Sequence, residues 1–269
     1  MRAVSVAILI ALPSLMVDGA AREASQIILL IALLAGLLVF SEYAVESPSI
    51  LEFRFAAPYN RIKFIALASV VILLSNIVRS GENPGSLTLL FADWARAIGA
   101  TLDFPYSPVR QVVLLLPADA PDSLVDLVRS AAGLSYGVSL LTILLFVVIV
   151  RVLGWPVRRG AFNVWMNLPM FDPTRGGDVV QKLQREAGIN LSLGFVLPFL
   201  LPAIVAVMQG VVETETHVTP QTLIWVISGW AFLPASLVMR GIAMHRVAEL
   251  ISAKRRRAYA RAEDALQVV

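Results

Sequence analysis

The strongest constraint on the fold is a pair of long apolar runs near the C-terminal end, Ile189–Val212 and Thr222–Met244. Each is close to the roughly 20 residues that an α-helix needs to cross the hydrocarbon core of a bilayer at ~1.5 Å rise per residue. The polar segment Glu213–Gln221 joins them, so the two runs predict a transmembrane hairpin. The basic block Lys254–Arg257 follows and favours a cytoplasmic C-terminus, because Lys and Arg are enriched on the cytoplasmic side.

The composition indicates further spans. The chain has 269 residues, of which 58% are hydrophobic and 15% are charged, and this is too apolar for a water-soluble domain of that length. We therefore expect an all-α, polytopic integral membrane protein, folded as a single membrane domain over residues 1–269, with about six transmembrane helices. The expected spans are residues 3–18, 25–45, 62–78, 134–151, 189–212 and 222–244.

The first apolar segment, Ala3–Val17, has two interpretations. Arg2 precedes it and the small residues Gly19, Ala20 and Ala21 follow, as in a secretory signal peptide. A span is favoured, because a second apolar run begins almost at once, which a cleaved secreted domain would not need. Its apolar residues reach only ~22 Å as a helix, so a span here requires local thinning of the bilayer or extension of the helix through Asp18 at the interface.

The longest connection, residues 80–133, is expected on the periplasmic face. Within it, Ser86–Leu102 has apolar residues at helical spacing, which predicts an amphipathic helix lying in the membrane interface. Asp122 or Ser123 is expected to start a second amphipathic helix that runs through Val128. Acidic residues outnumber basic ones in this connection: Glu82, Asp93, Asp103, Asp119, Asp122 and Asp126 against Arg96, Arg110 and Arg129.

The other connections are assigned to the cytoplasm, together with both termini. They are a surface loop over Ser47–Arg61, a loop over residues 154–188 with a short helix at Val179–Ala187, and a C-terminal helix over residues 245–269. This topology places 17 of the 22 Lys and Arg residues inside, in the sense that membrane proteins prefer. Arginine greatly outnumbers lysine, which indicates a GC-rich bacterial genome and therefore a bacterial inner membrane.

One short motif could carry chemistry. Gly133-Leu-Ser-Tyr-Gly137 matches the Gly-x-Ser-x-Gly pattern of serine hydrolases, and His217 is predicted on the same side of the membrane as Ser135. No strand is expected before Gly133, however, and the same two glycines have the spacing that lets transmembrane helices approach closely. Helix packing is the favoured interpretation, and no catalytic residue is expected.

Cofactor and metal sites are not expected either. The chain has no cysteine and only two histidines, His217 in a loop and His245 at a helix exit, so neither lies within a span. No nucleotide-binding or zinc-protease motif occurs. The sequence pI near 9.5 reflects membrane topology rather than a nucleic-acid partner, which we do not expect.

Transport is the alternative function. Pro198, Pro202 and Pro234 break the two helices of the predicted hairpin near their middles, and interrupted helices are where transporters build binding sites. Against this, no Asp, Glu, Lys or Arg is expected deep in any span, because Arg240 lies near the cytoplasmic end and can extend to the interface.

Two kinds of surface are expected to make contacts. Small residues in three spans let a neighbouring backbone approach and are expected to face other subunits: Ala32, Gly36, Gly133, Gly137, Ala231 and Ala235. Aromatic, Met and basic residues are expected to contact anionic lipid or a partner protein on the cytoplasmic face: Trp155, Arg158, Arg159, Phe162, Trp165, Met166, Lys254, Arg255, Arg256 and Arg257.

These features favour a non-catalytic accessory, scaffold or assembly component of a larger membrane protein complex. A carrier or channel for a small neutral or anionic solute is the alternative, and a membrane serine hydrolase is a more distant one.

Overall fold

A computed structural model describes residues 1–17, 22–79, 85–156, 162–171, 177–211 and 219–267. These residues form nine helices and no strand, which confirms the expected all-helical fold for the part of the chain described. The helices are α1 (Arg2–Met16), α2 (Arg22–Ala44), α3 (Tyr59–Arg79), α4 (Ser86–Leu102), α5 (Pro108–Val113), α6 (Asp122–Arg151), α7 (Val164–Asn167), α8 (Val179–Val211) and α9 (Pro220–Gln267). Five of them are long and apolar enough to cross a membrane: α2, α3, α6, α8 and α9.

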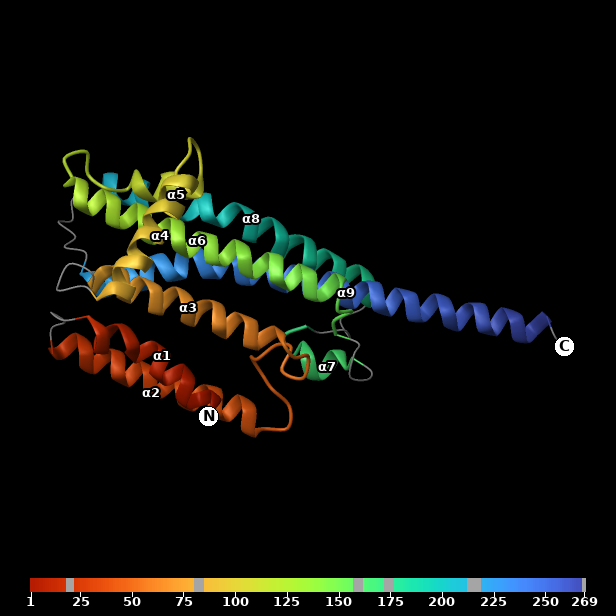
Figure 1. Cartoon of the computed structure of the whole chain (residues 1–269). Helices are drawn as coiled ribbons and strands as arrows, with labels where there is room; N and C mark the ends of the chain where they lie inside the picture. The colour runs from red at the N-terminus through yellow and green to blue at the C-terminus, as the bar shows by residue number, and fades with distance from the viewer. Residues whose placement is uncertain (18–21, 80–84, 157–161, 172–176, 212–218, 268–269) are drawn as a thin grey trace.

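The long helices run side by side along one axis (Figure 1). Helix α9 packs against α8, α6 and α3, while α1 joins α2 to the rest of the bundle through contacts with α3 and α9. Helix α4 crosses the bundle and packs on α6, and α5 lies beside it at the same end. The C-terminal part of α9 projects beyond the bundle in line with its own axis (Figure 1).

The α8–α9 hairpin is held together by two glycines that the sequence analysis did not single out. A Cβ atom added to Gly194 would lie 2.7 Å from the carbonyl oxygen of Pro234, and one added to Gly241 would lie 2.9 Å from that of Ala187. Because no larger side chain fits at either position, the two helices approach backbone to backbone, which increases the van der Waals contact between them.

Two expected breaks do not occur. The predicted interfacial helix near Val128 and the predicted fourth span are one continuous helix, α6, and the predicted helix Val179–Ala187 and the fifth span are one helix, α8. Neither junction contains proline, and a glycine inside a helix costs only ~1 kcal/mol relative to alanine. Gly133 and Gly188 therefore do not interrupt these helices.

The predicted surface loop Ser47–Arg61 is largely folded into the protein. Phe53 and Tyr59 are each only 1% exposed and pack with Phe146 and Trp155 in an aromatic cluster. The Arg54 guanidinium donates hydrogen bonds to the carbonyl oxygens of residues 42, 43 and 45 at 2.6–2.8 Å. It thereby satisfies the free carbonyls at the end of α2 and holds the loop against the bundle.

Helix α4 has the bounds that the sequence predicts, but its buried face is not its most apolar one. Ala95 is fully buried against the bundle, whereas Leu90 and Trp94 are 45% and 59% exposed. The small residues face α6 because they allow close approach, and the large apolar residues face outward. A location of α4 in the membrane interface stays a prediction.

Candidate functional site

A half-open cavity of about 490 Å³ lies at the end of the bundle where α2 ends and α3 begins. Side chains from α2, the segment that follows it, α3, α8 and α9 line it, so segments far apart in the sequence meet there. Its lining combines aliphatic residues with several polar and charged side chains. Charged side chains are rare beside helices that are apolar enough to cross a membrane. The polar lining residues are Glu42, Glu52, Tyr59, Asn60, Lys63, Asn190 and Arg240.

Arg240 and Glu52 form the central ion pair of this cavity. The Arg240 Nε and Nη2 atoms lie 2.6 and 2.8 Å from the two oxygens of the Glu52 carboxylate. The same Nη2 lies 3.5 Å from the Glu186 carboxylate at the start of α8. Such two-point pairing fixes both side chains. Arg240 therefore turns toward the protein and ties α9 to the segment before α3, rather than extending to the membrane interface as expected.

Glu42 is buried at the end of α2, with 7% of its surface exposed. Its carboxylate accepts hydrogen bonds from the backbone N–H groups of Ser49, Ile50 and Leu51 at 2.9–3.3 Å, and from the Ser49 hydroxyl. A carboxylate with this many donors is stabilised in its charged form without a basic partner. Glu42 thus fixes the turn that forms one wall of the cavity.

This polar cluster was not predicted from the sequence. Local sequence patterns assign no function to Glu42 or Glu52, and they indicate only that Arg240 can extend to the interface. The signal that could have revealed the cluster is charge balance: Glu42, Lys63 and Arg240 fall near helix ends assigned to the same side of the membrane, and Glu52 lies in a loop assigned to that side. Opposite charges brought to one end of a helix bundle are expected to pair.

A second cavity of about 290 Å³ lies beside the predicted helix breaks, between α6, α8 and α9. Pro198 and Pro234 line it, together with Tyr136 and Ser139 as its polar groups, and no charged side chain does so. Pro202 has no N–H, so the carbonyl of Pro198 loses its helical partner. The Trp230 Nε1–H donates to that oxygen at 3.0 Å. At this break the freed carbonyl is therefore satisfied within the chain.

The six small residues expected to face other subunits make contacts inside this chain instead. A Cβ atom on Gly36 would lie 3.3 Å from the Ala3 carbonyl oxygen of α1, and one on Gly137 would lie 3.3 Å from the Ile98 side chain of α4. A Cβ on Gly133 would overlap the Gly99 backbone of α4. The three alanines are likewise buried within the bundle: Ala32, Ala231 and Ala235. These positions are occupied by the chain's own helices and do not present a free surface.

Ser135, the serine of the Gly-x-Ser-x-Gly pattern, is fully buried in the middle of α6. Its hydroxyl donates to the Ala131 carbonyl oxygen at 2.8 Å, one helical turn back. His217 lies outside the described residues. A helical, buried serine bonded to its own backbone is not the exposed, strained residue that a nucleophile elbow requires.

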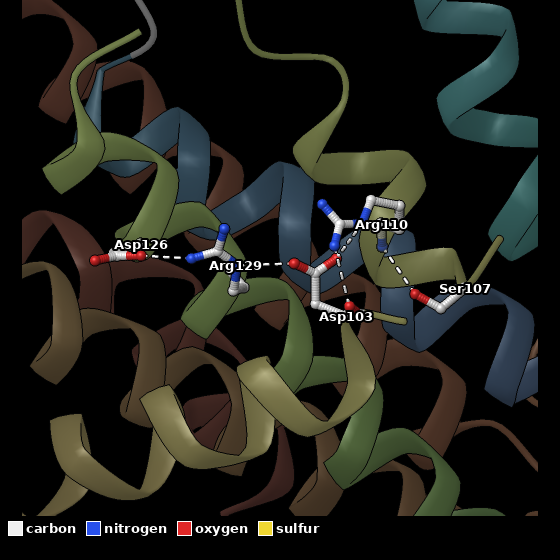
Figure 2. Close-up of polar contacts among 5 residues, drawn as sticks. All are labelled: Asp103, Ser107, Arg110, Asp126 and Arg129. Atoms are coloured by element: carbon white, nitrogen blue, oxygen red, sulfur yellow. Dashed lines mark hydrogen bonds and ion pairs between the residues drawn. The ribbon is translucent and has the colours of Figure 1, made fainter. Parts of the chain in front are cut away.

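Asp103 organises the opposite end of the bundle (Figure 2). Its side chain is 5% exposed, and its two oxygens lie 2.8 Å from Arg110 Nε of α5 and Arg129 Nε of α6. The Arg129 N–H is aligned for a hydrogen bond, whereas Arg110 makes a charge contact with an oxygen that has no aligned donor. Arg129 also pairs with Asp126. One carboxylate at the end of α4 therefore fastens three helices together.

The residues around Trp155 that were expected to form one contact surface differ in their exposure. Trp155 is 4% exposed and donates its indole N–H to the Ala56 carbonyl oxygen at 3.0 Å, so it belongs to the core. Phe162 and Met166 are half-buried, and Trp165 is 61% exposed. Arg158 and Arg159 lie outside the described residues. Both Trp155 and Trp165 are aromatic, so residue type alone could not predict that Trp155 is buried and Trp165 is exposed.

The basic block of α9 is exposed throughout residues 254–257. Arg255 Nη1 lies 2.5 Å from the Asp178 carboxylate, just before α8. The hydrogen bond from Arg255 lowers the pKa of Asp178 below its ordinary value of 3.8. A lowered carboxyl pKa means that the contact is fully present at neutral pH and is lost only as the pH falls through that lowered value. This pair fastens the base of the projecting part of α9 to the bundle.

Within the described residues, no group of three or more His, Cys, Asp or Glu side chains is arranged to hold a metal ion. No protein-family model matches the chain, and comparisons with curated proteins and with solved structures found no similar protein.

Proposed function

We propose that this protein is a non-catalytic accessory or scaffold component of a larger protein complex in a bacterial inner membrane. In this proposal both termini are cytoplasmic, and the C-terminal part of α9 contacts a partner protein. The observation that carries the proposal is the continuity of α9, which runs for 48 residues from an apolar region long enough to cross a membrane into a projecting helix whose residues 254–264 are exposed (Figure 1).

The length of the projecting part supports a role outside the bilayer. From Lys254, beyond the last buried residues of α9, to its end at Gln267 the helix extends ~20 Å at ~1.5 Å per residue. Residues 254–264 are all exposed, and Arg255 ties the start of this stretch to Asp178 just before α8. An isolated polar helix of this length is only marginally stable in water, because most helical stability comes from packing. We infer that a partner protein packs against this part of α9 and stabilises the helix.

The direction of the projecting part favours a protein partner over lipid. Gly241 is the last glycine of α9 and no proline follows it, so nothing in the sequence turns the helix onto the membrane surface. Lys254 therefore lies ~15 Å beyond Met244 along the axis, away from the lipid head groups. The exposed charges are mainly basic: Lys254, Arg255, Arg256, Arg257 and Arg261 against Glu263 and Asp264. The partner surface is therefore expected to be acidic.

The apolar outer faces of the helices do not distinguish a protein partner from lipid. Helices α2 and α8 expose large aliphatic side chains along most of their length, such as Leu33 and Leu37 of α2 and Leu193 and Val207 of α8. Lipid covers such surfaces as well as protein does. The apolar cavity beside Pro198 and Pro234 contains no charged residue, so it gives no specific support to an ion-coupled carrier.

Truncation after Ala253 tests the proposal directly. Membranes from the source bacterium are extracted with a gentle detergent, and polypeptides recovered with the full chain are compared with those recovered with the truncated chain. We expect the full chain to recover a defined partner and the truncated chain to recover it at least ~10-fold less, because a charged interface of several Arg residues contributes ~1.5–3 kcal/mol per paired group.

Two charge variants separate specific contact from loss of folding. Changing Lys254, Arg255, Arg256 and Arg257 together to Gln keeps the helix length and is expected to reduce recovery as truncation does. The matched control changes Glu263 and Asp264 to Gln and Asn, and recovery is expected to be unchanged. If all variants recover the same polypeptides, or the full chain is recovered alone, the accessory role is contradicted.

A further inference from the structure

The charged cavity between α2, α3, α8 and α9 is lined by four charged side chains, Glu42, Glu52, Lys63 and Arg240, whose partners differ. Both oxygens of Glu52 are bound by Arg240, and Glu42 is bound by backbone N–H groups and the Ser49 hydroxyl. These two acids therefore have little capacity left for a ligand. Lys63 is different, because among the described residues no carboxylate lies within ion-pair distance of its ammonium group.

Lys63 is also held in a defined place. Its Nζ lies 5.5 Å from the centre of the Tyr59 ring, a cation–π arrangement that positions the ammonium group without using its hydrogen-bond donors. The side-chain amides of Asn60 and Asn190 donate to the carbonyl oxygens of Glu52 and Glu186, which uses one of the two N–H donors of each amide. The cavity thus offers one ammonium group with free donors, beside the Glu52–Arg240 pair and a Glu42 carboxylate that is bound by backbone N–H groups and the Ser49 hydroxyl.

The rest of the cavity is apolar and continues along two helices. Leu38 and Leu237 line it on α2 and α9. Going away from the cavity, the same face of α2 carries Leu34 and Ile31, which are 56% and 51% exposed, and α9 carries Leu233, which is 57% exposed. Two exposed aliphatic stripes therefore lead from the bilayer region to the single available ammonium group.

We propose that this cavity binds one anionic glycerophospholipid, with its phosphodiester group at Lys63 and its acyl chains along the aliphatic stripes of α2 and α9. A phosphodiester carries one negative charge, which matches the ammonium group of Lys63, the cation of this cavity that has no carboxylate within ion-pair distance among the described residues. The cavity volume of about 490 Å³ suits a head group and glycerol, but not two whole acyl chains. The chains are therefore expected to remain between the helices and the surrounding bilayer. This binding site is independent of the proposed role of α9.

The test is a titration of the delipidated full-length protein in detergent with dioleoyl phosphatidylglycerol, followed by native mass spectrometry. We expect one lipid to bind before all others, and Lys63→Met to weaken that binding ~10-fold, the loss of one charge-assisted contact. Dioleoylglycerol has the same acyl chains but no phosphate. Its affinity for the wild-type protein is therefore expected to be as low as the affinity of phosphatidylglycerol for the Lys63→Met variant.

Arg61→Met is the matched control, because Arg61 is an exposed cation on the same helix that does not line the cavity. Its affinity for the lipid is expected to stay within ~2-fold of wild type, since exposed charges contribute little. Equal losses in the two variants, equal affinity for dioleoylglycerol, or displacement of the lipid by inorganic phosphate alone would each overturn the proposal. If Lys63→Met does not fold, Leu38→Trp is the second variant. Leu38 is half-exposed, and a tryptophan there fills the apolar side of the cavity, so we expect the first lipid no longer to bind. Unchanged lipid binding by Leu38→Trp would contradict the site.

Discussion

Replacing Gly133 with Leu is expected to separate α4 from α6 and to destabilise the protein by ~3 kcal/mol or more, because overpacking at a contact between backbones cannot be relieved by side-chain rotation. A Cβ at this position would overlap the Gly99 backbone, and a Cβ on Gly99 would lie 2.8 Å from the Arg129 carbonyl oxygen. The displaced α4 would also pull Asp103 away from its two arginines.

The measurement is the free energy of unfolding in mixed detergent micelles, compared with that of Gly229→Leu in the N-terminal part of α9. A Cβ on Gly229 meets no atom within 4 Å, so that variant is expected to be neutral or slightly stabilising. Gly137 and Gly36 also pack against this chain's own helices, so enlarging either residue is expected to disturb packing within the bundle. Equal stability of the Gly133 and Gly229 variants would contradict the close crossing of α4 and α6.

Asp103→Asn is expected to destabilise the protein by ~2 kcal/mol, because it leaves Arg110 and Arg129 facing each other without the carboxylate that both contact. This value is below the ~3–5 kcal/mol typical of a fully buried pair. The reason is that the two arginine side chains are 37% and 27% exposed and remain partly hydrated.

Asp93→Asn serves as the control for the Asp103 variant. Asp93 pairs with Arg96 on the same face of α4, but both side chains are more than 60% exposed. Its loss is expected to cost less than ~0.5 kcal/mol. The loss of unfolding free energy caused by Asp93→Asn is expected to differ more between low and high salt than the loss caused by Asp103→Asn, because salt screens exposed charges more strongly. Similar costs for both variants would contradict the buried role of Asp103.

The helices themselves could largely be predicted from hydrophobic periodicity. The hairpin of α8 and α9 and the bounds of α4 follow from apolar runs, proline and cap residues, which are local properties of the sequence. The junctions at Gly133 and Gly188 could not be predicted, because a single glycine in an apolar environment is compatible with both a break and a continuous helix.

The side-chain clusters were beyond the reach of local patterns. Whether Glu52 and Arg240 pair depends on which helices become neighbours, and these residues are separated by 188 positions. Trp155 and Trp165 have the same chemistry and close positions, yet one lies in the core and the other is exposed. Small residues predicted that helices would approach closely, but not that the neighbour would belong to the same chain.

The most direct test of the proposed accessory role is photo-crosslinking in living cells from a probe placed at Ala258, an exposed position on the projecting part of α9. A second probe at Leu200, which is 43% exposed on the membrane-spanning helix α8, reports contacts within the bilayer. The account predicts a discrete protein adduct from position 258, which the substitution of Lys254–Arg257 by Gln abolishes. Adducts from position 258 to lipid alone, or no protein adduct, would contradict it.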